Sequence, residues 1–297
     1  MKPIQRIHHI SAIVGDPNEN LRFYRDVLGL RLIKQTVNFD DPSVYHLYFA
    51  DYDVTPGTIM TFFPWPNNNY GWKGSGQVGR IAFRIPKGSV EYWKEHLTAE
   101  SLTFKQTNLF GNTTLEFQDI HQLDLALVEG DTEADTPAIL GFHGSILLSA
   151  NPKETNDLLT TQMGLTRVTV EGDYHHFETV GKEKHRILTP ILPQPGGRFG
   201  IGTVHHIAWS VPDIKALEDW QTKLRGEGFG ATMIKDRNYF ESVYLKERGR
   251  VIFEFAIDGP GFMIDETFDE LGQTLQLPAQ YEHMREEYTR LLPELDV

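Results

Sequence analysis

The sequence contains no cysteine, and this absence removes several kinds of chemistry at once. Disulfides, thiolate nucleophiles, iron–sulfur clusters and thiolate zinc sites all need that side chain. Any catalytic or metal-binding function must therefore come from histidine, carboxylate, tyrosine or arginine side chains, or from a bound ion.

Positive charge is also scarce, because 28 Lys and Arg face 41 Asp and Glu, which gives a net charge of -13. No basic run could follow a phosphate backbone, so neither nucleic acid nor an anionic membrane is expected as a partner. No segment approaches the roughly 20 apolar residues of a membrane span, and the N-terminus shows no signal-peptide pattern. We expect a soluble, cytoplasmic protein, and a homo-oligomer is compatible with the sequence.

The chain does contain ample material for a core, with 40% hydrophobic residues among 297. Its first part predicts a strand at residues 7–14 and a helix at 18–28 that ends at Gly29. Three segments rich in β-branched and aromatic residues follow, at 31–37, 45–50 and 58–63. This order, βαβββ, indicates an α+β unit.

The same order recurs three times, beginning near Gly79, Gly141 and Val204. In the second unit strands are predicted at 102–106, 112–117 and 123–128, and in the fourth around Ala231 and at 240–246 and 250–257. A tail helix is expected near residues 278–292. We predict four βαβββ modules arranged as two domains, residues 1–131 and 138–297, with the acidic segment 129–137 as linker. Residues 64–76 read as a connector, or alternatively as a lid over an apolar ligand.

Two His-His pairs occupy the same place in the first strands of modules one and four, His8-His9 and His205-His206. Successive strand residues point to opposite faces, so only one imidazole of each pair can face the concave side of its sheet. Modules two and three lack such pairs, which predicts one metal per chain.

Glu254 interrupts the otherwise apolar segment 251–257, the expected last strand of module four. A carboxylate buried there without a partner would cost several kcal/mol, so it needs a cation. An arginine could serve. Two imidazoles from equivalent strands complete the two-histidine, one-carboxylate set that leaves open positions on Fe(II). Zn(II) accepts the same donors, but no HExxH helix indicates a zinc hydrolase.

Longer motifs add a resemblance that covers essentially the whole chain. They are HHIS near the N-terminus, YHLYFAD at 45–51, PGTIMTFFP at 56–64 and DRNYFESVYLKERGRVIFEFAIDGPGF at 236–262. In these motifs the chain resembles the vicinal oxygen chelate superfamily. Within it, the chain is similar to the hydroquinone 1,2-dioxygenases and the Bacillus-type quinone-responsive ring-cleaving dioxygenases. This resemblance implies a vicinal oxygen chelate fold with one metal on first and last strands.

Residue by residue, the resemblance implies that His9, His206 and Glu254 bind the metal. It implies that five residues surround the substrate: His8, Ser11, His205, Arg237 and Tyr244. His8 and His205 are expected to move protons, because imidazole titrates near neutral pH. Without the resemblance, Arg237 would be interpreted as a surface ion pair with Asp236 or Glu241.

The turn after Tyr244 decides where that side chain points. A two-residue turn at Arg248-Gly249 would pair Val243 with Glu254, whereas a three-residue loop pairs Tyr244 with Glu254 directly. The role of Tyr244 requires the longer loop. In this family a Pro-Gly-Gly type turn is commoner than the Glu247–Arg250 turn found here.

The expected function is an Fe(II)-dependent, extradiol-type ring-cleaving dioxygenase that acts with O2 on hydroquinone-type or catechol-type aromatics, in aromatic catabolism or quinone detoxification. Mn(II) accepts the same donors, and Zn(II) is less favoured. Two alternatives stay open. One is a glyoxalase-type metal-dependent isomerase or lyase, for which segment 58–63 offers no fourth acidic ligand. The other is a non-catalytic quinone- or drug-binding protein of the same fold.

Overall fold

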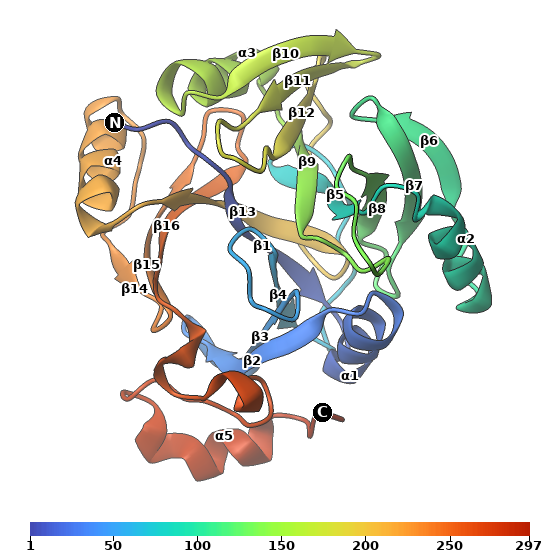
Figure 1. The fold of residues 1–297 in the computed structure, drawn as a ribbon. Helices are drawn as coiled ribbons and strands as arrows, with labels where there is room; N and C mark the ends of the chain where they lie inside the picture. Colours follow the sequence, from blue (N-terminus) through green and yellow to red (C-terminus); the bar gives the residue numbers. More distant parts are fainter.

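The computed structural model describes residues 1–297 and contains four βαβββ modules in chain order (Figure 1). In every module the first strand pairs in parallel with the fourth, and the two remaining strands extend the sheet outward. The predicted α+β fold of four modules is therefore confirmed.

The first half of the chain forms modules one and two. Module one consists of β1 (Ile7–Val14), α1 (Pro17–Arg22), β2 (Arg31–Asn38), β3 (Asp41–Ala50) and β4 (Ile59–Pro64). Module two consists of β5 (Gln77–Ile85), α2 (Val90–Ala99), β6 (Lys105–Leu109), β7 (Asn112–Gln118) and β8 (Asp124–Glu129).

The second half forms modules three and four and the tail. Module three consists of β9 (Phe142–Leu148), α3 (Pro152–Asp157), β10 (Thr166–Glu171), β11 (Tyr174–Glu178) and β12 (Arg186–Pro190). Module four consists of β13 (Thr203–Val211), α4 (Ile214–Gly226), β14 (Lys235–Asp236), β15 (Phe240–Lys246) and β16 (Ile252–Pro260). The tail carries short 3-10 turns and α5 (Arg285–Leu291), which lies beside β3 (Figure 1).

Two predicted elements differ from the structure. The strand expected around Ala231 is absent, and only Lys235–Asp236 pairs as β14. Three alternating glycines precede it, at positions 226, 228 and 230, and glycine weakens a strand because it has no side chain to pack. The tail helix is shorter than expected, since residues 282–284 form a 3-10 turn before α5.

The first strands of the modules join the halves of the chain. β1 runs antiparallel to β13, and β5 runs antiparallel to β9, so module one pairs with module four and module two with module three. A single pair, Val204 with Val78, connects β13 to β5. These ladders cross the predicted boundary between the two domains; the division at residues 1–131 and 138–297 itself stays a prediction.

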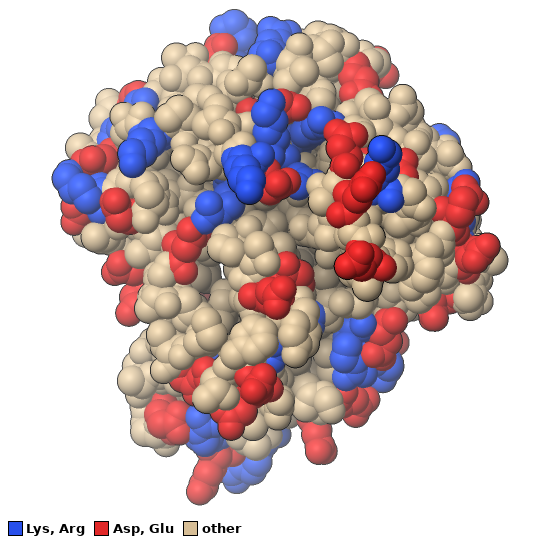
Figure 2. Space-filling model, in the orientation of Figure 1, with Lys and Arg blue, Asp and Glu red and all other residues tan.

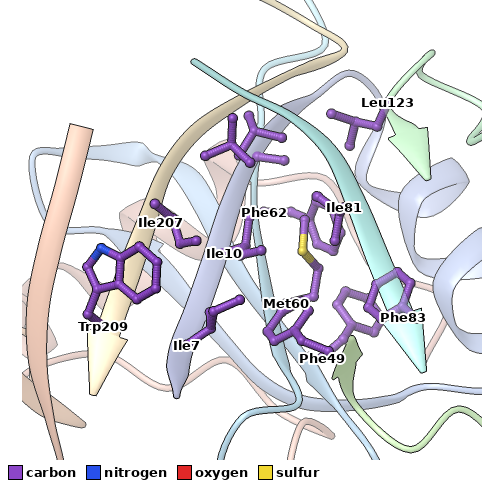
Figure 3. Packing of buried hydrophobic residues seen from close by; sticks show 14 of the residues in the cluster. Ile7, Ile10, Phe49, Met60, Phe62, Ile81, Phe83, Leu123, Ile207 and Trp209 are labelled. Carbon is purple, nitrogen blue, oxygen red and sulfur yellow. The ribbon is translucent and has the colours of Figure 1, made fainter. Parts of the chain in front are cut away.

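The central strands present one face to the apolar core and the other to the cavity. On β1, Ile7 and Ile10 point into the main apolar cluster, where they pack with Ile207 and Trp209 of β13 (Figure 3). This cluster includes buried residues from all four modules, so the modules share one continuous core. None of the helices is both long and apolar enough to cross a membrane. On the face in Figure 2, Lys and Arg are interspersed with Asp and Glu.

A buried lysine fixes the tail to module one. Lys34 on β2 is fully buried, and its Nζ contacts Glu266 and lies 2.5 Å from Asp265 Oδ1. Tyr239 donates its hydroxyl proton to the other oxygen of Asp265 at 2.9 Å. These contacts hold the tail against a small apolar cluster that includes Tyr48 and Phe240.

We predict that Lys34→Met lowers the free energy of unfolding by about 3–5 kcal/mol, because it leaves two neighbouring carboxylates without their buried cation. Lys153→Met is the control, since Lys153 is exposed and faces Asp157 across one helical turn, where a pair is worth under about 0.5 kcal/mol. Urea unfolding measures both. Equal losses in the two variants would contradict the role of Lys34.

Candidate metal centre and substrate cavity

Three buried donors converge between modules one and four: His9 on β1, His206 on β13 and Glu254 on β16. The Nε2 atoms of His9 and His206 lie 3.0 and 2.9 Å from the same oxygen of Glu254. The two nitrogens are 3.2 Å apart. The three predicted ligands therefore lie together, although they come from three strands.

Glu254 is buried without a hydrogen-bond donor for either of its carboxylate oxygens. Burial alone would raise the pKa of Glu254, but the adjacent His9 and His206 outweigh it and hold that pKa well below its usual range. An ionised, buried carboxylate beside two converging imidazole nitrogens fits a divalent cation. The three side chains form a candidate metal site.

The first histidine of each pair occupies a β-bulge. The ladder between β1 and β13 is irregular at two places, and His8 and His205 are the extra residues there. A bulge leaves its extra residue unpaired and re-aims the side chain. Neighbouring imidazoles can therefore touch, with Nδ1 atoms 2.7 Å apart in His8 and His9, and 2.8 Å apart in His205 and His206.

The carbonyl of Ile257 determines the proton positions in the first pair. His8 Nε2 lies 3.1 Å from this oxygen, which only accepts, so Nε2 carries a proton. Burial and the adjacent His9 lower the pKa of His8 to about 4, which keeps its imidazole neutral. The Nδ1 of His8 therefore accepts a hydrogen bond from the Nδ1–H of His9, and His9 keeps a free lone pair on the Nε2 that faces Glu254.

The same burial affects the first histidine of both pairs. Burial, with His206 beside it, lowers the pKa of His205 to about 3, and His8 behaves similarly. Burial therefore favours the neutral form of both imidazoles. The expected role of His8 and His205 in moving protons stays a prediction.

A cavity of about 270 Å³ opens beside the three donors. Its walls are largely aromatic, and one part of its rim is polar because the turn between β2 and β3 reaches it. The Phe, Tyr and Trp residues are Phe39, Tyr48, Phe63, Trp65, Phe240 and Tyr244, and the polar turn residues are Asn38, Asp40 and Asp41. The cavity therefore suits a small aromatic molecule that carries polar substituents.

Tyr244 pairs with Glu254 across β15 and β16, which confirms the longer loop. The N–H of Glu247 donates to the carbonyl of Val251 at 3.0 Å and leaves residues 248–250 as the loop. Its left-handed residue is Arg250, with φ of 75°. Glycine would adopt this conformation without strain, which accounts for the commoner glycine-rich turn.

Arg237 lines the cavity and contacts module one. Its Nε donates to the hydroxyl oxygen of Tyr244 at 3.2 Å, and its Nη2 donates to Asp40 at 3.1 Å. The alternative pairing with Asp236 or Glu241 is therefore wrong. Burial raises the pKa of Tyr244, so the phenol keeps its proton. Because its oxygen accepts from Arg237, its O–H remains available to donate to a ligand.

Two of the five residues expected around the substrate lie behind the cavity wall instead. His8 lies against His9 and the carbonyl of Ile257, and Ser11 is fully buried with its Oγ 2.6 Å from Thr61 Oγ1. The other three, His205, Arg237 and Tyr244, line the cavity.

His46 is a cavity residue that sequence reasoning missed. Its Nδ1 and Nε2 lie 2.9 Å from the hydroxyl oxygens of Tyr48 and Thr61, and its ring lies 4.3 Å from that of Phe63. Burial lowers the pKa of His46 well below its ordinary value, so its ring is neutral. His46 interrupts the apolar part of β3, as Glu254 interrupts that of β16. The same sequence pattern could therefore have identified His46.

The segment 64–76 leads from β4 of module one to β5 of module two. Trp72 and Arg198 exchange backbone hydrogen bonds at 3.0 and 2.9 Å, which ties the segment to residues 195–201. Only Trp65, at its start, reaches the cavity wall. Trp65 therefore contributes to the cavity wall, while the part of the segment around Trp72 is held against residues 195–201.

We predict that Gly249→Ala destabilises the hairpin that carries Tyr244 and Glu254, because its Cβ would lie 2.0 Å from Ser149 Oγ. The expected loss is about 1–3 kcal/mol, typical of overpacking. Gly226→Ala is the control, since nothing lies within 4 Å of its Cβ position. Identical unfolding midpoints for the two variants in urea would contradict a steric requirement for glycine at position 249.

Comparisons with known proteins agree with this geometry. Residues 6–137 match the Glyoxalase/Bleomycin resistance protein/Dioxygenase superfamily. The chain is 45% identical to a Bacillus subtilis protein assigned as the ring-cleaving dioxygenase MhqO, over 98% of this chain and 97% of that protein. It is 29% identical to a chlorohydroquinone/hydroquinone 1,2-dioxygenase of Sphingobium indicum, over 97% and 96%.

A crystal structure of a protein assigned as a dioxygenase, also from Bacillus subtilis, superimposes with a TM-score of 0.96 at 44% identity. It covers 100% of this chain and 99% of the other. Full-length similarity at this level is not confined to the fold and extends over all four modules. The chain belongs to the ring-cleaving dioxygenases of the glyoxalase/bleomycin resistance protein/dioxygenase superfamily.

Proposed function

We propose that this protein is an Fe(II)-dependent, extradiol-type dioxygenase that cleaves the ring of hydroquinones with O2. The observation that carries the proposal is the buried Glu254 carboxylate, which has no hydrogen-bond donor and faces two imidazole nitrogens beside an aromatic cavity. Full-length relatives with ring-cleaving names at 45% and 29% identity support the reaction class.

His9, His206 and Glu254 would hold the metal. When bound, Fe(II) supplies open coordination positions and a redox-active centre between an aromatic ring and O2, which do not react readily on their own. The donor set favours Fe(II), and Mn(II) accepts the same ligands. Zn(II) binds them too, but it has no redox chemistry to contribute.

The residues of the cavity would orient the substrate. The free O–H of Tyr244 can donate to a phenolic oxygen near the three donors, and the Arg237 guanidinium stabilises negative charge on that oxygen. If His206 coordinates through Nε2, its Nδ1–H donates to His205 Nδ1. His205 then carries its proton on Nε2 and can donate a hydrogen bond into the cavity.

Loss of metal tests the ligand set directly. We expect His206→Ala and Glu254→Ala to lose bound iron, because each removes one of only three donors. His205→Ala is the control and should keep its iron with up to about 100-fold weaker affinity, since it only orients a ligand. Metal analysis after anaerobic Fe(II) loading and desalting measures this. Stoichiometric iron in His206→Ala would refute the ligand assignment.

The substrate class is tested by comparing para- and ortho-diols. A catechol binds a metal through two adjacent oxygens, whereas a hydroquinone has one oxygen in reach and needs a hydrogen bond for the other. The polar rim at residues 38–41 offers acceptors for that far hydroxyl. We therefore expect a higher kcat/KM for methylhydroquinone than for 3-methylcatechol.

The measurement is O2 uptake by the Fe(II)-loaded protein with each diol. A clear advantage for the catechol would reject the hydroquinone assignment and leave ring cleavage standing. No O2 uptake with either diol would reject dioxygenase activity and favour a Lewis-acid isomerase or a binding protein.

A further inference from the structure

The cavity contains one arginine, and that arginine already has an anionic partner. Arg237 has a side chain only 14% exposed, so its guanidinium belongs to the cavity wall. Asp40 is 65% exposed and stands at the rim, where its Oδ2 accepts from Arg237. The pair joins module four to module one across the mouth of the cavity.

Asp40 is ionised because cations surround it. Burial alone would raise the pKa of Asp40, but Arg237, and Lys235 at 3.6 Å, outweigh burial and lower that pKa. The carboxylate therefore offsets the positive charge that Arg237 would otherwise present. Asp41 adds a second negative charge to the same rim. The ionisable side chains that line the cavity thus carry no excess positive charge.

We propose that Asp40 is a specificity-determining residue, which occupies Arg237 and thereby excludes hydroquinones that bear a carboxylate. An arginine in a cavity wall would otherwise pair with a ligand carboxylate through charge-assisted hydrogen bonds. With Asp40 in place, such a ligand meets like charge at the rim and aromatic side chains inside. The preferred substrates are neutral hydroquinones with apolar substituents, an inference that rests on the proposed function.

Asp41 provides a matched control in the same turn. It also lines the cavity, but its Oδ1 accepts from the hydroxyl and the backbone N–H of Ser43 at 2.6 and 3.3 Å. It makes no hydrogen bond or ion pair with an arginine. Asp40→Asn and Asp41→Asn therefore remove the same charge from the same rim, while only Asp40→Asn removes the carboxylate that pairs with Arg237.

The test compares two ligands that differ mainly in charge, 2-propylhydroquinone and 3-(2,5-dihydroxyphenyl)propanoate. Their dissociation constants are measured by anaerobic titration calorimetry on Fe(II)-loaded wild type, Asp40→Asn and Asp41→Asn. The wild type should prefer the neutral ligand. In Asp40→Asn we expect the preference to fall at least about tenfold, equivalent to about 1.4 kcal/mol. In Asp41→Asn it should change less than about threefold.

Two results would overturn the inference. One is an unchanged preference in Asp40→Asn, and the other is an equal fall in both variants, which would indicate a general charge effect. Thermal unfolding of both proteins verifies that they are folded. Because O2 is excluded from the titration, the measured binding selectivity does not depend on ring cleavage. A wild type that binds hydroquinone without consuming O2 in air would reject the proposed function, not the role of Asp40.

Discussion

The buried carboxylate of Glu254 is the constraint on which the arrangement of the molecule depends. A charge removed from water costs several kcal/mol unless opposite charge compensates it. The two imidazoles that approach Glu254 belong to β1 and β13, which are neighbours only because module one pairs with module four. The pairing of distant modules is therefore what assembles the site, and the core that the four modules share holds this pairing in place.

The two bulges show how local irregularity serves that site. In a regular strand, adjacent side chains point to opposite faces and their rings stay apart. Because His8 and His205 are extra residues, each can turn its ring toward the neighbouring histidine. On β1 the resulting chain runs from the Ile257 carbonyl through two imidazoles to the lone pair that faces Glu254. The Ile257 carbonyl thus fixes the proton position on His9 through His8.

Local pattern was sufficient for much of this structure. Strand periodicity predicted the modules, and a charge in an apolar strand singled out Glu254. Loop parity left two positions open for Tyr244, and the structure has the one beside Glu254. The signal that singled out Glu254 would also have identified His46. Bulges break the alternation on which such reasoning depends, so the positions of His8 and His205 did not follow from it. Neither did the contact of Arg237 with Asp40, which lie 197 positions apart and meet only through module pairing.

Modules two and three show what the same architecture does without the donors. Their first strands pair Ala82 with Gly144 where modules one and four carry histidines. A Cβ at Gly144 would lie 1.8 Å from the carbonyl oxygen of Arg186, so no side chain fits there. The region around Ala82 is part of an apolar cluster that includes Phe110 and Leu188. One pair of modules thus closes around this cluster and the buried His143 and His176 beside Phe110, while the other opens around three converging donors. Side chains at a few strand positions, rather than the fold itself, decide where chemistry can occur.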